Sequence, residues 1–375
     1  MSKEELDEAL RGIRKHYKPL EEGMRELEGL TPEVAHSVLS SLEATANAGH
    51  APSNLAFTLS TGLESKAITH RELALLAPAL EATANRGHDP YYLANILSSG
   101  LKSRAITHEN LKQSADHVRT ALEATANAGH NPRYLAFTLS TGLESKAITH
   151  RELALIAPLL QATANTGHNP GDLVSTLSAG LKSKTITHRE LALMAPALEA
   201  TANAGHKPWP LASTISSGLK SRAITHENLK QSADHVRTAL EATAKAGHDP
   251  GDLVSTLSAG LESKTITHRE LALIAPLLQA TANTGHNPWP LASTISSGLK
   301  SKAITHKNLS LLVDHLEANA RIHDPLHLIE HAFMAKKELG IPLSQVFTLQ
   351  NKFIGEGHFP TARSVIEYHR RFHKR

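Results

Sequence analysis

Residues 68–105 read ITHRELALLAPALEATANRGHDPYYLANILSSGLKSRA, and near copies of this segment decide the fold. The tripeptide Ile-Thr-His recurs at intervals of 38 or 42 residues, beginning at Ile68, Ile106, Ile148, Ile186, Ile224, Ile266 and Ile304. A diverged copy starts at Leu30 and a degenerate one at Ile341, which extends the series to eight or nine units. No stretch alternates with the period of a β-strand. Tandem units of this length are typical of α-solenoids, in which each unit buries its apolar face against its neighbours.

Each unit carries its own helix boundaries. The residues Thr69-His70-Arg71-Glu72 form a capping box that starts a first helix, here helix A. Gly87 supplies the left-handed residue that ends helix A, and Asp89-Pro90 provides the N-cap and first turn of a second helix, helix B. Helix B is expected to fade near residues 100–103. Pro78 is expected to kink helix A or to split off a short first helix. The two longer units insert four residues, about one extra helical turn.

These signals predict an all-α fold, namely a right-handed superhelical α-solenoid of 38–42-residue helix-turn-helix repeats. We expect an N-terminal capping helix at residues 1–29 and tandem repeats at residues 30–340. Residues 341–375 are interpreted as a degenerate C-terminal capping repeat with a basic tail. Terminal repeats should differ from the rest because one of their faces meets solvent.

Composition narrows the function classes. Of the 375 residues 40% are hydrophobic, which is enough for a continuous core, and the net charge is only +3. Without cysteine there are no disulfides and no thiolate metal sites, which fits a reducing compartment such as the cytoplasm or nucleoid. A secreted effector acting in a host cell stays open. No run of 18 apolar residues predicts a membrane span, and the charged N-terminal stretch lacks a signal-peptide core.

The copies differ mainly at three places in helix B, which we call the variable positions. They are the first, second and fifth residues after the proline that begins helix B, and on a helix these form one surface patch. The leucine at the third place never varies, as expected for a buried residue. The variable positions are Ser53, Asn54, Phe57, Tyr91, Tyr92, Asn95, Arg133, Tyr134, Phe137, Gly171, Asp172, Ser175, Trp209, Pro210, Ser213, Gly251, Asp252, Ser255, Trp289, Pro290 and Ser293.

Aromatic residues mark the variable positions as a candidate binding surface. All seven aromatic residues between Leu30 and Ala320 occupy variable positions. They could fill gaps between repeats, but exchanging Trp for Gly at equivalent core sites would leave a cavity or a clash. Exposed aromatic residues that vary on a constant frame suit a recognition surface better.

A second row of residues, here the basic row, follows the end of helix B. The basic row consists of Lys66, Lys102, Arg104, Lys146, Lys182, Lys184, Lys220, Arg222, Lys264, Lys300 and Lys302. Glu64, Glu144 and Glu262 interrupt it. Cations repeated beside stacking residues are what a phosphate backbone and its bases require. Alternatively, the basic row is a solvated loop that keeps the array soluble.

The histidines and the other polar residues do not indicate catalysis. Most of the 25 histidines belong to the repeated motifs, as His70 and His88 do. Equivalent histidines in successive repeats should be a helix layer apart, which is too far to share one metal ion. We therefore interpret them as capping residues or inter-repeat hydrogen-bonding residues. No nucleophile–base pair, paired carboxylates or Gly-rich phosphate loop is present, so we expect neither an enzyme nor a cofactor.

In its logic the array resembles the PUF, pentatricopeptide, octotricopeptide and TAL-effector-like families, where a constant frame carries a few variable residues per repeat. The 38-residue unit is similar in length to the octotricopeptide repeat, and Leu93-Ala94-Asn95 is similar to a motif of that family. The resemblance implies a scaffold that binds DNA or RNA, one nucleic-acid unit per repeat.

The competing interpretation is a scaffold for a peptide or protein, similar to armadillo or tetratricopeptide arrays. Asp172 and Asp252 favour it, because phosphates repel a carboxylate. On nucleic acid, these aspartates could instead accept a hydrogen bond from a cytosine amino group.

Overall fold

The structure, a computed structural model, describes residues 31–372, so the capping helix expected at residues 1–29 lies outside the described part. The chain divides into two compact units after Trp209, and each unit is described by itself. The described residues form helices and connecting turns, with no strand. Within residues 31–372, no helix combines the length and the apolar character that crossing a membrane would require.

The helices follow the repeat. Those of the first unit are α3 (Pro32–Asn47), α4 (Pro52–Glu64), α5 (His70–Asn85), α6 (Pro90–Ser103), the 3-10 turn η3 (His108–Asn110), α7 (Leu111–Asn127), α8 (Pro132–Glu144), α9 (His150–Asn165), α10 (Pro170–Lys182) and α11 (His188–Asn203). Those of the second unit, whose first helix begins at the boundary itself, are α12 (Trp209–Ser221), η4 (His226–Asn228), α13 (Leu229–Lys245), α14 (Pro250–Glu262), α15 (His268–Asn283), α16 (Pro288–Lys300), α17 (His306–Asn319), α18 (Pro325–Leu339), α19 (Leu343–Gly355) and α20 (Ala362–Phe372).

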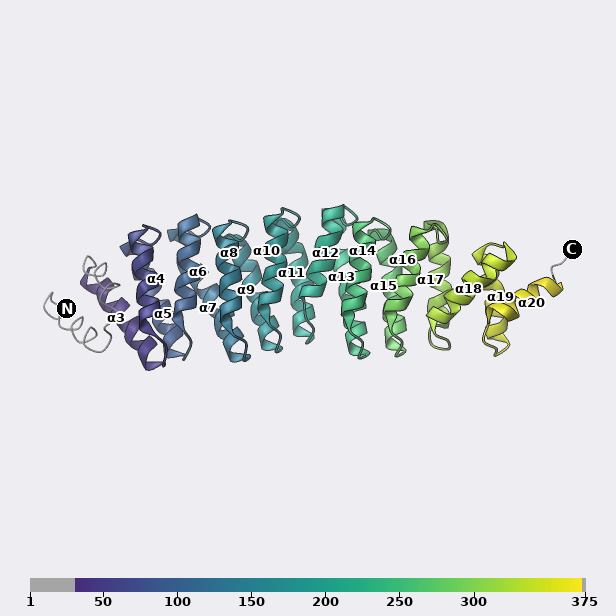
Figure 1. Ribbon diagram of the computed structural model, residues 1–375, viewed down its shortest axis with the longest axis horizontal. Coiled ribbons are helices and arrows are strands. Elements are labelled where there is room, and N and C mark those ends of the chain that lie inside the picture. The colour runs from purple at the N-terminus through teal and green to yellow at the C-terminus, as the bar shows by residue number, and fades with distance from the viewer. Residues whose placement is uncertain (1–30, 373–375) are drawn as a thin grey trace. The chain divides into compact units, whose positions relative to one another are not determined.

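Equivalent helices of successive repeats stack on one another within each unit. In the first unit, helices A (α3, α5, α7, α9 and α11) pack in order, and helices B (α4 to α10) form a second layer beside them (Figure 1). In the second unit, α13 to α19 and α14 to α20 repeat the pattern. The predicted all-α solenoid of two-helix repeats is confirmed, while its right-handed twist stays a prediction.

The core is aliphatic, as the sequence predicts. The leucine at the third place of helix B is between 0 and 1% exposed in every copy from Leu55 to Leu291. Burying one such side chain stabilises the fold by about 1.5–3 kcal/mol. The repeated Ile-Thr-His motif contributes Ile68 and its counterparts, which are also buried.

The predicted helix boundaries are confirmed. The Thr69 N–H donates to Glu72 Oε2 at 2.7 Å, and the Glu72 N–H donates to Thr69 Oγ1 at 3.4 Å, which completes the capping box. Asp89 Oδ1 accepts from the Tyr91 N–H at 3.0 Å at the start of α6. Gly87 ends helix A with a φ of +82°. These local bonds place the variable positions in the first two turns of helix B.

One of the two outcomes expected at Pro78 is corrected. Helix α5 continues unbroken through Pro78, so no short first helix splits off, while the kink stays a prediction. Pro78 is exposed, and water can satisfy the carbonyl that loses its partner there. Helix B ends within the expected residues 100–103, since α6 runs to Ser103. Gly100 lies inside α6, and a Cβ atom on it would lie 2.6 Å from Cδ1 of Ile106, which folds back over the helix.

Candidate functional site

The aromatic residues at the variable positions lie at the surface. Phe57 is 70% exposed, Phe137 68%, Tyr134 44% and Trp289 37%. The remaining three, Tyr91, Tyr92 and Trp209, are half-buried. None of the seven is fully buried. The aromatic residues therefore do not serve only to fill gaps inside the core.

Seven variable positions of three successive repeats line one pocket. It has a volume of about 470 Å³ and lies between the starts of α4, α6 and α8. Its lining is Asn54, Phe57, Asp89, Tyr91, Tyr92, Asn95, Arg133, Ala136 and Phe137. The two other lining residues, Asp89 and Ala136, are not variable positions. The sequence pattern indicates Asp89 only as a helix N-cap and gives no sign that it lines a pocket.

The pocket combines ring faces, amides and a single cation. Tyr91 and Tyr92 pack edge to face, with ring centroids 5.4 Å apart and planes at 62°. Partial burial, followed by the nearby Asp89 carboxylate, raises the pKa of Tyr92, so its phenol stays neutral and can donate a hydrogen bond. Exposed rings and amides of this kind can stack on and hydrogen-bond a planar heterocycle.

The indole of Trp289 contacts the preceding repeat. Its Nε1 atom donates to Thr256 Oγ1 of α14 at 3.1 Å, so the ring crosses from α16 to the neighbouring helix B. The hydrogen bond orients the indole and leaves part of the ring open to solvent. Trp289 is therefore positioned by a residue of another repeat.

Two of the variable positions, Gly171 and Pro210, are buried, which is not expected of residues that contact a ligand. The reason at Gly171 is the Tyr134 ring of the preceding repeat: a Cβ atom on Gly171 would lie 2.2 Å from Tyr134 Cδ1. The tyrosine thus lies over this glycine. Apart from the aromatic residues, the other variable positions are exposed or half-buried.

All eleven residues of the basic row are exposed. Seven of them adopt the left-handed backbone conformation, with φ between 54° and 64°, and they are Lys66, Arg104, Lys146, Lys184, Arg222, Lys264 and Lys302. Within residues 31–372, these are the non-glycine residues with a positive φ. Seven successive repeats, those of α4 to α16, therefore place a cation in a conformation that favours glycine, a feature that no sequence signal indicated, whereas Gly340 caps the end of α18.

The basic row lies at the opposite end of helix B from the variable positions. Tyr91, Asn95 and Lys102 nevertheless share one face of α6, since their spacing is i, i+4 and i+11. The helical rise separates Asn95 from Lys102 by about 10 Å along the axis. A ligand that contacts both rows must lie along helix B rather than across its start.

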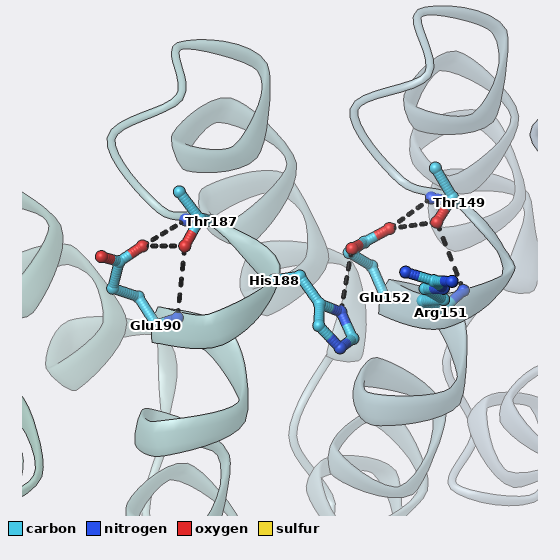
Figure 2. A network of polar contacts seen from close by, with 6 residues as sticks. All are labelled: Thr149, Arg151, Glu152, Thr187, His188 and Glu190. Carbon is cyan, nitrogen blue, oxygen red and sulfur yellow. Dashed lines mark hydrogen bonds and ion pairs between the residues drawn. The ribbon is translucent and has the colours of Figure 1, made fainter. Parts of the chain in front are cut away.

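Polar contacts at the start of helix A join successive repeats. In Figure 2 the His188 ring points toward Glu152 of the preceding repeat, and Nδ1 lies 3.0 Å from Oε1. Oε2 of Glu152 accepts from the Thr149 N–H at 2.9 Å. Burial raises the pKa of Glu152, but the bonds from Thr149, with help from His188, outweigh it and leave the pKa lowered. His150 and His268 instead contact Ser114 and Ser232, at 3.1 Å each.

Histidines at the other end of helix A make a second set of inter-repeat bonds. Their Nε2 atoms lie 3.0 to 3.2 Å from the carbonyl oxygen of a glycine in the next repeat; the pairs are His50–Gly87, His130–Gly167, His168–Gly205 and His248–Gly285. The interpretation of these histidines as inter-repeat residues is confirmed. Among the described residues, no three His, Asp or Glu side chains gather as a metal site would require.

Comparisons with protein-family models, with curated proteins and with solved structures found no match.

Proposed function

We propose that this protein is a modular scaffold that binds nucleic acid through its variable positions and its basic row. The pocket between α4, α6 and α8 is the observation that carries the proposal. Its lining offers the ring faces of Phe57 and Phe137, the amides of Asn54 and Asn95, and the guanidinium of Arg133. Rings that stack on a base contribute about 1–3 kcal/mol per base.

The left-handed cations support phosphate contacts. A left-handed backbone costs a residue with a side chain roughly 1–2 kcal/mol, a cost that glycine avoids. The same repeats use glycine at the end of helix A, as at Gly49 and Gly129, but Lys or Arg at the end of helix B. Attraction of a cation to the helix C-terminus offsets only about 0.3–1 kcal/mol of this cost. The chain thus retains a row of cations at a net cost in folding stability. Such a row is expected if the cations bind a polyanion.

Binding of labelled single-stranded RNA and DNA, measured by fluorescence anisotropy at several salt concentrations, tests the proposal. Each phosphate contact should steepen the logarithmic salt dependence of affinity by about 0.7. Phe137→Ala should weaken binding by about 1–3 kcal/mol and leave thermal stability nearly unchanged. The matched variant Leu135→Ala should cost about 2–5 kcal/mol of stability, because Leu135 is a core residue. The proposal would be overturned if oligonucleotide affinity changed neither with salt concentration nor on Phe137→Ala substitution.

A peptide-binding scaffold is the second candidate. Asp172 and Asp252 are exposed in the first turns of their helices, where they would repel phosphates. Under this alternative, a random peptide library yields binders enriched in basic residues, while the oligonucleotides bind weakly and without preference.

A further inference from the structure

Two interfaces between neighbouring helices B are closed by the same polar pair. Ser99 Oγ of α6 donates to Glu144 Oε1 of α8 at 3.0 Å. In the second unit, Ser217 Oγ of α12 donates to Glu262 Oε1 of α14 at 3.1 Å. The serine stands nine residues after the proline at the start of helix B, and the glutamate stands twelve residues after the corresponding proline of the next repeat. A carboxylate from one repeat therefore satisfies a hydroxyl of the preceding one.

The interface between α16 and α18 keeps the serine and lacks the carboxylate. Ser297 stands nine residues after Pro288, in the place of Ser99 and Ser217. Twelve residues after Pro325, where the glutamate would stand, the chain has Lys337. At the α16–α18 interface a positive charge therefore stands where the other two interfaces have a negative one.

A pocket of about 700 Å³ lies at this interface. Its lining includes the hydroxyls of Ser293, Ser297 and Ser301, the ring of Phe333, and Lys336 and Lys337. Lys336 Nζ donates to the Ala303 carbonyl at 3.1 Å, which holds one ammonium at the rim. Lys337 is exposed and makes no ion pair within residues 31–372. Pockets of this size, largely apolar with a few convergent polar groups, suit small organic ligands.

We propose that the α16–α18 pocket binds a small organic acid, with its anionic group on Lys337 and the serine hydroxyls and its apolar body against Phe333. The anion takes the place that a glutamate carboxylate occupies in the two internal interfaces. A carboxylate and a phosphate monoester share this chemistry, and both would make charge-assisted hydrogen bonds there. The pocket shares one residue, Ser293, with the variable positions, and its contacts to Lys337 and Phe333 do not depend on nucleic-acid binding.

Isothermal titration calorimetry on the full chain tests the site with phenylacetate, phenyl phosphate and the neutral phenylacetamide. Both acids should bind with one-to-one stoichiometry, and the amide should not. The tighter of the two acids identifies the ligand source as a carboxylate or a phosphate ester. Lys337→Glu should introduce a serine–glutamate pair like those of the other two interfaces, weaken acid binding by about tenfold or more, and leave the melting temperature unchanged or higher.

Lys300→Glu is the matched control, because Lys300 stands at the equivalent place of α16 and lies outside the pocket. It makes the same change of charge and should leave acid binding within about twofold of the unaltered chain. The proposal fails if no probe releases heat at millimolar concentration. It fails equally if the amide binds as well as the acids, or if the two lysine variants weaken binding alike.

Discussion

At the scale of single residues, the variable positions of adjacent repeats depend on one another. Tyr134 lies over Gly171 of the following repeat, and Trp289 donates to Thr256 of the preceding one. The exposure of an aromatic ring is therefore set by the residue that its neighbouring repeat supplies. If the variable positions bind a ligand as proposed, each contact surface includes parts of two repeats.

Gly171→Ala and Gly251→Ala form a matched pair for this coupling. A Cβ atom on Gly171 would clash with the Tyr134 ring, whereas on Gly251 the nearest atom is Asp249 Oδ1 at 3.2 Å. Alanine in a helix is more stable than glycine by about 0.5–1 kcal/mol, so Gly251→Ala should raise the unfolding free energy by that amount. Gly171→Ala should not raise the unfolding free energy, because its Cβ atom meets the ring. In a protein that also carries Tyr134→Ala, Gly171→Ala should raise it as Gly251→Ala does. Equal effects in chemical denaturation would show that the ring does not rest on Gly171.

Lys146→Gly separates folding from binding at one left-handed position. Lys146 has a φ of 57°, so glycine should raise the unfolding free energy by about 0.5–1 kcal/mol. Oligonucleotide affinity should fall, and the salt slope should flatten by about 0.7, one phosphate contact. Gly129→Ala, at the left-handed position of helix A, should destabilise the fold by about 1–2 kcal/mol. Unchanged affinity would mean that Lys146 does not contact phosphate.

At the scale of the helix, the start of helix A both caps the element and joins it to the next repeat. Glu152 bonds the Thr149 N–H with one carboxylate oxygen and pairs with His188 through the other (Figure 2). Glu72 makes the capping box of α5 in the same way. The neighbouring repeat thus decides whether a capping glutamate also becomes an interface residue.

Glu152→Gln should cost about 1 kcal/mol more stability than Glu72→Gln, since Glu152 is buried and bonded across the interface. The pKa of Glu152 is lowered from its ordinary value of 4.5, so its stabilising effect is present above pH 4.5. That effect is lost as the pH falls through the folded-state pKa. Urea unfolding at neutral and acidic pH should therefore show the gap between Glu152→Gln and the unaltered chain narrowing. A gap that persists at acidic pH would exclude the carboxylate as its source.

At the scale of the whole molecule, the order of the repeats is itself a prediction about the target. Gly171, Asp172 and Ser175 recur as Gly251, Asp252 and Ser255, and Trp209, Pro210 and Ser213 recur as Trp289, Pro290 and Ser293. Four successive units thus carry two sets of variable residues in alternation. If each unit contacts one element of a linear polymer, the target contains a two-element motif twice in succession.

Selection from a random oligonucleotide library measures this directly. We expect an enriched motif with an a-b-a-b core, flanked by three further elements that differ from one another. The two copies of the first element should differ in strength, because Tyr134 precedes Gly171 in the chain whereas Pro210 precedes Gly251. Tight binding to a motif without an internal two-element repeat would refute one unit per repeat.

The amino-acid sequence determined the repeat, the helix boundaries and the division into core and surface. Thr69, Gly87 and Asp89 act through bonds to residues nearby in the chain, so their patterns are sufficient to place the helix ends. The invariant leucines follow from helical periodicity alone. The variable positions were found for the same reason, since near-identical copies expose whatever differs.

Tertiary structure alone decided the features that join residues a full repeat apart. The pocket forms because three helices B bring their starts together, and Gly171 is buried because a ring from another repeat covers it. The sequence shows where these residues stand in each unit. Only packing between the stacked repeats sets which of them meet, because contact energies between distant residues leave no local pattern in the chain.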